Sequence, residues 1–341
     1  MRMAFLLLCT LGQDTQFKVR SDLVFLPTRV QDKKGDTIYG LRPEQFVVED
    51  NGVRQTVTID DDPEAAGLSL VVAVQCSRSA ELELKKLSGL GAMIEAITGG
   101  APHEVAVLAY GSSPFVLGDF SRSSVETRIA LTKLRDCADH NAAAIDTVDF
   151  AIDMLKHRQN HYRKAILLIG ETRDHGSKAK LDELVAELGV TDTVIYTVAF
   201  SAARDEMLYD LKHSNDAYNT EPPKPAPPKP PELDHNPDGM ATTELPPRMI
   251  WPPQLVLLVN ALKGNAASEL AALSGGEYVN FTTQKGFDAS LLRISNQIHN
   301  FYMLSFKAST DTGLHKLKVR VPDYPSARIQ TRKSYWSEGQ R

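Results

Sequence analysis

Two serines that follow a strongly apolar run near residue 70 are the first side chains whose types and spacing suggest chemistry. The run Ser69–Val74 is rich in valine, a pattern typical of a strand buried on both faces. Ser77 and Ser79 lie in the turn after it, preceded by Gln75. Ligands of open α/β sheets bind beyond the carboxyl ends of central strands, so the sequence predicts a polar site in this turn.

The other reactive side chains form no recognisable catalytic motif. The nine histidines include no His-Glu-x-x-His pair, and His157 and His161 fit a solvated basic patch. The Gly-x-Ser-x-Gly elbow of serine hydrolases and the Gly-Lys-Ser/Thr phosphate loop are also missing. We therefore expect a protein that is not an enzyme.

Composition and charge narrow the class of protein further. Of the 341 residues, 42% are hydrophobic and 24% are charged, which is typical of a globular protein with a sizeable core. A net charge of −5 argues against nucleic-acid binding, which needs a basic excess. No apolar run reaches the ~20 residues of a membrane-spanning helix, so no transmembrane segment is expected.

The first residues resemble a secretory signal peptide. Arg2 precedes the apolar residues 3–11, and small residues follow, so we place the signal peptide at residues 1–12. We expect an exported protein that is periplasmic, extracellular or associated with the cell envelope. The alternative is a hydrophobic N-terminus that is not cleaved.

Strand patterns fill the next part of the chain. Residues 13–62 contain β-rich runs separated by turns, and Asn51-Gly52 lies between two β-branched runs, which is a strong hairpin signal. We interpret these residues as an N-terminal β-module. Residues 61–67 are a polar connector to the next domain.

Strands and helices alternate from residue 68 to residue 299, as in a doubly wound, mainly parallel α/β sheet. The expected strands are 68–74, 104–110, 165–170, 194–200 and 277–281, with 114–120 as an antiparallel edge strand. The expected helices are 81–97, 125–134, 143–156, 178–188, 202–211 and 287–299.

Residues 221–253 interrupt this domain with 12 of the chain's 19 prolines. We interpret them as a surface insertion or stiff linker rather than as a peptide ligand for an aromatic groove. Three β-runs then close the chain within residues 300–337. The simplest arrangement pairs them with the N-terminal strands in one β-sandwich-like module, with the α/β domain inserted between.

The whole layout resembles the bacterial von Willebrand factor A-related proteins that are common in acidobacteria. The matching stretches are the opening FKVRSDLVFLPTRV, the Gly-Gly strand LAALSGGEYVNF and the closing runs FYMLSFKAS and RKSYW. Ser77 and Ser79 match the Asp-x-Ser-x-Ser loop of von Willebrand A domains. The resemblance implies a von Willebrand A-like (Rossmann-like) fold in an exported protein that binds other macromolecules.

In such domains three loops hold a divalent cation, and this chain departs from the pattern in each of them. Gln75 stands in place of the first Asp, Ala142 or Ala143 in place of the Thr, and Glu171 in place of the last Asp. Hard cations, Mg²⁺ above all, prefer anionic oxygens in strict geometry, so we expect no cofactor and no bound divalent cation. A cation, if bound, would be held by Ser77, Ser79 and Glu171.

We therefore predict a non-enzymatic, exported protein-binding or scaffold protein with a degenerate metal site. Its partner-binding residues in the top loops would be Gln75, Ser77, Arg78, Ser79, Ala142 and Glu171. Ser79 is equally well placed to cap a helix beginning near Ala80. The alternatives are a cation-dependent adhesion module and a structural subunit of an envelope or multi-protein complex.

The three cysteines, Cys9, Cys76 and Cys137, lack the spacing of a zinc site. Cys76 and Cys137 remain if the signal peptide is removed, and in this type of fold they come to the same face. Either a disulfide across that face or two free buried thiols fits the sequence.

Overall fold

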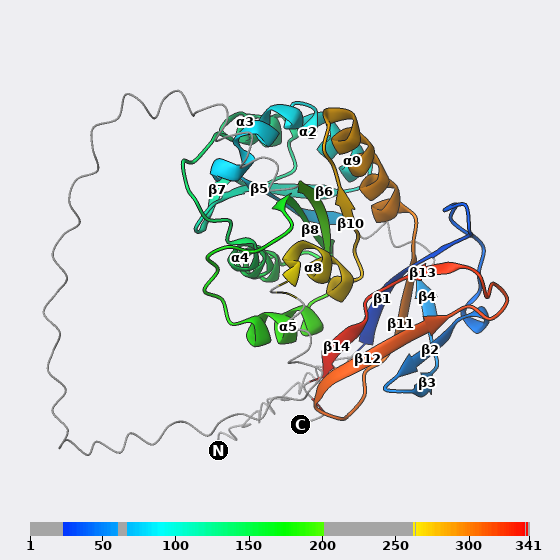
Figure 1. Cartoon of the computed structure of the whole chain (residues 1–341). Coiled ribbons are helices and arrows are strands. Elements are labelled where there is room, and N and C mark those ends of the chain that lie inside the picture. Colours follow the sequence, from blue (N-terminus) through cyan, green and yellow to red (C-terminus); the bar gives the residue numbers. More distant parts are fainter. Residues whose placement is uncertain (1–22, 61–66, 201–261, 263, 338, 340–341) are drawn as a thin grey trace, which may run out of the picture.

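The structure is a computed structural model that describes residues 23–60, 67–200, 262, 264–337 and 339 (Figure 1). It consists of an α/β domain and a smaller β-module (Figure 1). The expected signal peptide, the expected helix 202–211 and the proline-rich stretch 221–253 lie outside the described residues. None of the described helices has the length and apolar character that crossing a membrane requires.

The α/β domain is built on a six-stranded sheet with strand β5 (Leu68–Gln75) near its centre. In spatial order the strands are β10 (Tyr278–Asn280), β9 (Thr193–Phe200), β8 (Arg163–Glu171), β5, β6 (His103–Tyr110) and β7 (Pro114–Ser121). Neighbouring strands pair in parallel, except for the edge strand β7, which is antiparallel to β6. This order is the doubly wound, von Willebrand A-like arrangement, so the fold prediction is confirmed.

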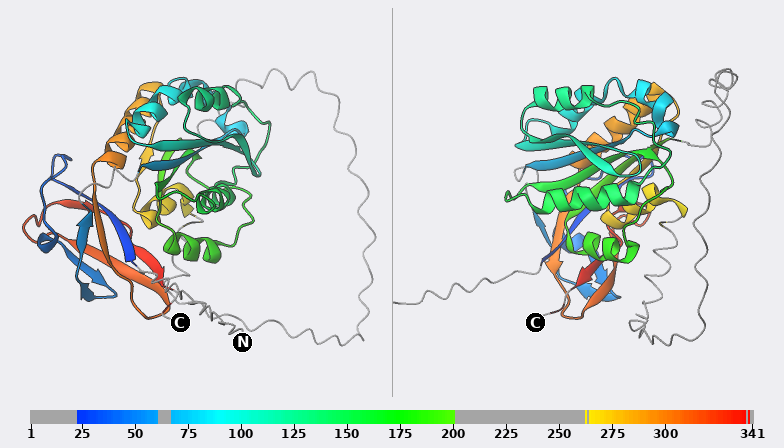
Figure 2. Two further views of the ribbon diagram at one scale, coloured as in Figure 1. Left: turned by 180° about the vertical axis from the view of Figure 1, so that it is seen from behind. Right: turned by 90° about the vertical axis from the view of Figure 1, so that its left-hand side faces the viewer.

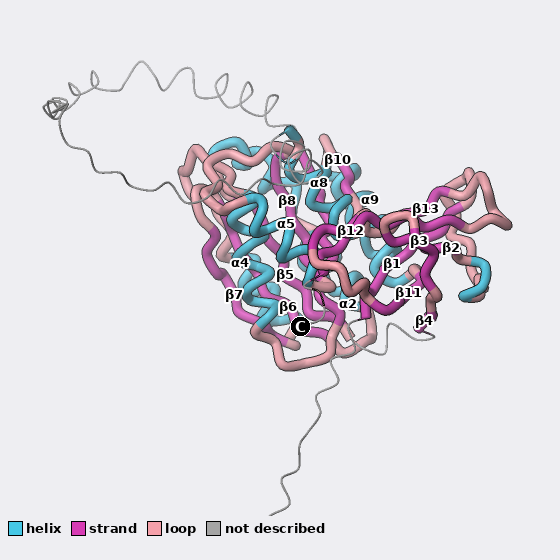
Figure 3. Tube along the Cα trace, turned by 90° about the horizontal axis from the view of Figure 1, so that it is seen from below, coloured by secondary structure: helices cyan, strands magenta, loops and turns pink. Residues whose placement is uncertain are grey.

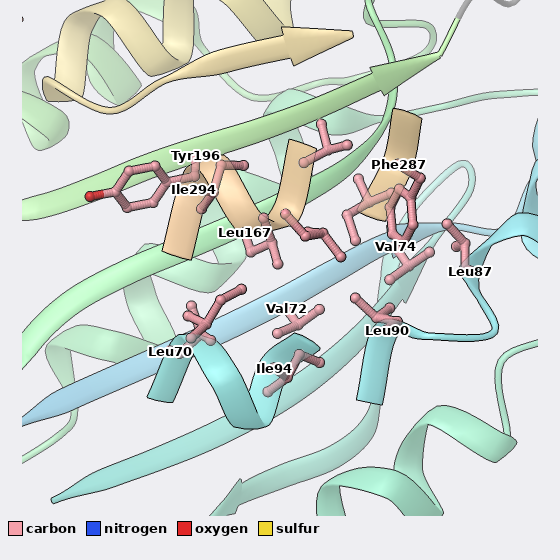
Figure 4. Packing of buried hydrophobic residues seen from close by; sticks show 14 of the residues in the cluster. Leu70, Val72, Val74, Leu87, Leu90, Ile94, Leu167, Tyr196, Phe287 and Ile294 are labelled. Carbon is pink, nitrogen blue, oxygen red and sulfur yellow. The ribbon is translucent and has the colours of Figure 1, made fainter. Parts of the chain in front are cut away.

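Both faces of β5 are buried because successive side chains of a strand point to opposite faces. Leu70, Val72 and Val74 join the core on one face, and Val71 and Ala73 join the core on the other. Figure 4 shows the first core, in which β5 faces helices α2 (Leu90–Thr98) and α9 (Gln284–His299). Helix α3 (Ser124–Thr132) contributes to the same core. The opposite face is covered by α4 (Ala144–Lys156), α5 (Leu181–Val190) and α8 (Ala266–Ser274).

The prediction of a single helix over residues 81–97 is wrong. The structure has a 3-10 turn η2 (Arg78–Ala80), a short helix α1 (Glu81–Leu84), a second 3-10 turn η3 (Lys85–Leu87) and then α2. Gly89 is the N-cap residue of α2. Because glycine inside a helix costs about 1 kcal/mol relative to alanine, the chain breaks the helix at this point.

Helix α5 also differs from the expectation, since it begins at Leu181 rather than at Lys178. The carboxylate of Asp146, in the first turn of α4, accepts hydrogen bonds from the backbone N–H groups of Lys178 and Ala179. These bonds hold both residues in the loop and delay the start of the helix.

The β-module is made of two four-stranded sheets that share one core. One has the order β13 (Arg328–Gln330), β1 (Leu23–Gln31), β11 (Tyr302–Lys307) and β4 (Thr58–Asp60). The other has the order β14 (Ser334–Ser337), β12 (Gly313–Arg320), β2 (Val47–Asp50) and β3 (Val53–Gln55), and a 3-10 turn η1 (Pro43–Gln45) precedes β2.

Strands from both ends of the chain pair in this module, as expected. β1 pairs with β11, and β2 pairs with β12, all antiparallel. Asn51 and Gly52 have φ angles of 48° and 86° between β2 and β3, as a two-residue hairpin turn requires. The last of the three expected β-runs is in fact two strands, because β13 pairs with β1 in one sheet and β14 pairs with β12 in the other.

The β-module lies beside the α/β domain (Figure 2 and Figure 3), and side-chain contacts join the two near the amino ends of β9 and β10. Arg332, which is buried, donates to the carbonyl of Leu188 in α5 at 2.9 Å, and it lies 3.7 Å from the Asp192 carboxylate. Arg29 of β1 lies 3.9 Å from Glu277, the residue before β10. Two arginines of the β-module are therefore anchored on the α/β domain.

Candidate functional site

The site predicted after the first α/β strand forms where β5 and β8 end side by side. The two strands pair in parallel up to Val74 and Ile169, so the next residues, Gln75 and Gly170, are neighbours at the carboxyl edge of the sheet. Glu171 follows Gly170 as the last residue of β8. Parallel pairing alone thus brings Gln75 and Glu171 together, although they are 96 residues apart in sequence.

The side chain of Gln75 is the centre of this site. Its Nε2 donates to Ser77 Oγ at 2.7 Å, to Ser79 Oγ at 2.8 Å and to Glu171 Oε1 at 3.2 Å. Its Oε1 accepts the backbone N–H of Glu171 at 2.7 Å. A backbone N–H can only donate, so this last bond fixes which end of the amide faces the serines. One neutral amide therefore joins the first loop to the third.

These residues do not fit a divalent cation. A cation would need the oxygens of Ser77, Ser79 and Glu171 to converge on it, but they converge on the amide nitrogen of Gln75 instead. An amide nitrogen that carries hydrogens cannot be a ligand, since it has no free lone pair to offer a hard ion. In the described part of the chain, no group of three or more His, Cys, Asp or Glu side chains is arranged to hold a metal.

The polar residues of the site are buried. Gln75 is 1% exposed, Ser77 0% and Glu171 6%. A Cβ atom at Gly170 would clash with the hydroxyl of Tyr110 and lie 2.8 Å from Gln75 Oε1, so only glycine lets the two strands and the amide pack this closely. Burial raises the pKa of the Tyr110 hydroxyl, and the nearby carboxylates of Glu171 and Asp174 raise it further.

The second loop contributes backbone groups rather than a hydroxyl. Ala142 and His175 exchange two backbone hydrogen bonds of 2.9 Å, and Ala143 donates to the carbonyl of Gly111 at 2.7 Å. Both alanines are fully buried. Asp174, in the third loop, accepts the backbone N–H of Ile145 at 2.9 Å, so its carboxylate holds the start of α4. The three loops are therefore linked to one another without an ion.

A disulfide joins Cys76 to Cys137, with their Cα atoms 5.3 Å apart, so the structure favours the disulfide over the two free thiols. Backbone hydrogen bonds join the same two segments. The N–H of Cys137 donates to the carbonyl of Cys76 at 2.9 Å, and the N–H of Arg78 donates to the carbonyl of Asp139 at 2.8 Å. The Asp139 carboxylate in turn accepts the backbone and side-chain donors of Ser112, and these bonds lower its pKa. Sequence reasoning did not single out Asp139 or Ser112, whose only signal was their place in loops at the same edge.

The six predicted partner-binding residues therefore divide into two groups. Gln75, Ser77, Ala142 and Glu171 are buried and hold the loops from beneath, whereas Arg78 and Ser79 are partly exposed. The exposed residues of the other two loops at this edge include His140, Asn141, Arg173 and His175.

The expected helix cap is wrong. Ser79 has no capping bond to the backbone of α1, whose N-cap is Ala80, because its hydroxyl accepts from Gln75 instead. The Gln75 amide also donates to the hydroxyl of Ser77. Ser77 is the residue before η2, and its side chain makes no capping hydrogen bond to that turn.

No family model matches this chain, and neither does any curated protein. Solved structures that resemble it include the conserved hypothetical protein BatB from Bacteroides thetaiotaomicron, with 12% identity over 39% of this chain and 67% of that chain (TM-score 0.33). An aerotolerance-related membrane protein from Bacteroides fragilis has 11% identity over 68% of this chain and all of that chain (TM-score 0.39). The von Willebrand A domain of SpRpn10 has 19% identity over 45% of this chain and 83% of that chain (TM-score 0.33). The likenesses are distant, and the fold assignment above rests on the strand order.

Proposed function

We propose that this chain is a non-enzymatic, exported protein of the bacterial von Willebrand A-related kind, which binds a protein partner or acts as a scaffold without a cation. The observation that carries the proposal is the Gln75 amide, which donates to Ser77, Ser79 and Glu171 together. It supplies by hydrogen bonding the link between the loops that a cation would otherwise supply by coordination.

The partner surface in this proposal is the exposed rim of the same loops. Arg78 and Ser79 are partly exposed, and Arg173 and His175 are exposed on the loop after β8. Polar loops that a rigid sheet holds in place are well suited to binding, because little conformational entropy remains to be lost. The buried residues beneath would set the shape of this rim rather than touch the partner.

The cation part of the proposal is tested by calorimetry and thermal unfolding with Mg²⁺, Mn²⁺ or Ca²⁺. We expect no binding heat and no change of the melting temperature at millimolar cation, and no effect of a chelator. Gln75→Asp restores the Asp-x-Ser-x-Ser sequence and should make the melting temperature rise with added Mg²⁺. Gln55→Asp, on an exposed strand of the β-module, is the matched control. A micromolar cation site in the unmodified chain would overturn the proposal.

The partner part is tested by affinity capture with the full chain from extracts of the native organism. We expect a protein whose capture survives the chelator and is lost in the double variant Arg78→Glu/Arg173→Glu. The control Arg54→Glu/Lys307→Glu changes the same number of charges at exposed positions of the β-module. A partner that is retained by the loop variant would contradict the loop surface and favour a structural subunit with idle loops.

A further inference from the structure

A groove lies between the two parts of the chain, away from the loops described above. It has a volume of about 450 Å³ and is bordered by α8 and the start of β10 on one side and by β12 and β13 on the other. Figure 3 shows these four elements from below. Apolar side chains contribute to its walls, among them Ala272, Leu317 and Ile329.

The charge of this groove is strongly one-sided. Lys318, Arg328 and Lys333 line it with exposed side chains, and within the described residues none of the three has a carboxylate within 4.0 Å. The acidic residue in the lining, Glu277, is already paired with Arg293 and lies 3.9 Å from Arg29. The groove therefore offers three cations to a ligand and has its own carboxylate neutralised, although the whole chain carries a net charge of −5.

The groove also brings together the edges of two different sheets. β10 is an edge strand of the α/β sheet, and β13 is an edge strand of one sheet of the β-module. Toward β9, the carbonyl of Glu277 accepts from Thr197, and the N–H of Phe281 donates to Ala199. Because alternate residues of a strand bond to the same neighbour, the backbone groups of Tyr278 and Asn280 point away from β9. Such an outward edge accepts an additional strand.

We propose that this groove binds an extended, acidic segment of a protein partner, which pairs with the outer edge of β10 while its carboxylates contact Lys318, Arg328 and Lys333. The backbone edge supplies hydrogen bonds that any sequence satisfies, and the three cations select acidic side chains. The Gln330 side chain donates to the carbonyl of Gly276 at 2.5 Å, so it covers that carbonyl, and Tyr278 is the next residue along this edge. This inference does not depend on the proposed role of the top loops.

The test is fluorescence polarisation of the full chain with a labelled peptide of alternating Glu and Val, against a peptide of alternating Lys and Val. We expect the acidic peptide alone to bind, with an affinity that falls as salt increases. Arg328→Glu/Lys333→Glu should weaken it by about tenfold or more, since it replaces two cations that attract the peptide with two carboxylates that repel it. Lys285→Glu/Lys307→Glu, at exposed positions outside the groove, should leave binding unchanged.

The backbone pairing has its own variant. Tyr278→Pro removes the N–H at the outer edge, where proline is tolerated, so binding should fall while thermal unfolding of the chain stays close to that of the unmodified protein. Equal binding of both peptides, no binding of the acidic peptide at millimolar concentration, or equal losses in the groove and control variants would overturn the acidic-segment proposal. Undiminished binding by a folded Tyr278→Pro variant would overturn the strand pairing.

Discussion

The polar groups at the carboxyl edge of the α/β sheet and those in the groove beside β10 have opposite surroundings. At the carboxyl edge, the donors and acceptors of Gln75, Ser77 and Glu171 satisfy one another and are nearly inaccessible to solvent. In the groove, the cations of Arg328 and Lys333 are exposed, and among the described strands none pairs with the outer edge of β10. The polar groups beneath the top loops are therefore closed off from solvent, although the rim above them is exposed, whereas the cations of the groove are open to a partner.

This difference shows how polar residues can contribute to a fold or to binding, depending on what surrounds them. A buried polar group must find its partner within the protein, because leaving it without one costs about 1–3 kcal/mol. An exposed charge is already solvated by water, so it adds little to stability and remains available to a partner. Removing the buried groups at the carboxyl edge should therefore change stability, whereas removing the exposed cations of the groove should change binding.

The largest effect is expected from the disulfide at the carboxyl edge. Cys76 and Cys137 are 61 positions apart, and closing a loop of that size restricts the unfolded chain by about 4 kcal/mol. Cys76→Ala/Cys137→Ala should lose about this much stability in urea unfolding. A reductant should destabilise the unmodified protein and leave the double variant unchanged. A reductant that affects neither protein would show that the disulfide is not formed.

Gly170→Ala comes next, because the new Cβ would meet the Tyr110 hydroxyl and Gln75 Oε1 inside a packed core. Overpacking of this kind should cost about 3 kcal/mol, measured by urea or thermal unfolding. Gly100→Ala is the control, since nothing lies within 4 Å of its added Cβ. If both variants unfolded alike, the carboxyl edge would not be closely packed, and the contrast with the groove would weaken.

The amino end of the same sheet holds a buried carboxylate, Glu104, which can be compared with the buried neutral amide of Gln75. Glu104 in β6 accepts two hydrogen bonds from Arg158 and others from Ser69 and Asn160. Burial alone would raise the pKa of Glu104, but the bonds from Arg158, Ser69 and Asn160 outweigh burial and lower it below its ordinary 4.5.

A carboxylate with a lowered pKa in the folded state contributes stability above its unfolded pKa and loses it as the pH falls through the folded one. The unmodified chain should therefore lose stability as the pH falls below about 4.5. Glu104→Gln should cost about 2 kcal/mol at pH 7 and remove this part of the pH dependence. Unfolding midpoints from pH 3 to pH 7 measure the stability cost and the change in pH dependence. Glu126→Gln, at an exposed position, is the control. An acid profile that Glu104→Gln leaves unchanged would assign the sensitivity to other carboxylates.

The smallest effect on stability is expected in the groove. Lys318→Ala/Arg328→Ala/Lys333→Ala removes three exposed cations that have no described ion-pair partner, so each should change the free energy of unfolding by less than about 0.5 kcal/mol. Chemical unfolding measures the sum. A loss of several kcal/mol would mean that the groove residues hold the two parts together, and the comparison would have to be revised.

The repeating patterns of the chain predicted most of the fold. The apolar run at β5, the alternation of strands and helices and the Asn51-Gly52 turn are local signals, and local geometry alone determines them. Local propensity did not show where the tertiary contacts would interrupt a helix. The late start of α5 is an example, because it depends on Asp146, which is distant in sequence. The break at Gly89 follows from a local preference, the cost of glycine inside a helix, which the prediction overlooked.

Within the candidate site, the sequence showed which residue types differ from the Asp-x-Ser-x-Ser pattern that it resembles but not what these residues contact. Compared with an aspartate, Gln75 lacks a negative charge. Only its contacts show that its amide also donates to three oxygens. The same holds for Ala142, which the sequence placed among the contact residues and the structure buries beneath them.

The sequence by itself determined the order of the elements and the residue types that follow the central strands, because both can be derived from residue type and spacing. Only the tertiary structure decided that the Gln75 amide joins two loops, that Cys76 bonds to Cys137, and that β10 and β13 border one groove. Each of these features depends on groups that are far apart along the chain. Their meeting depends on strand pairing and packing, which no local pattern of residues encodes.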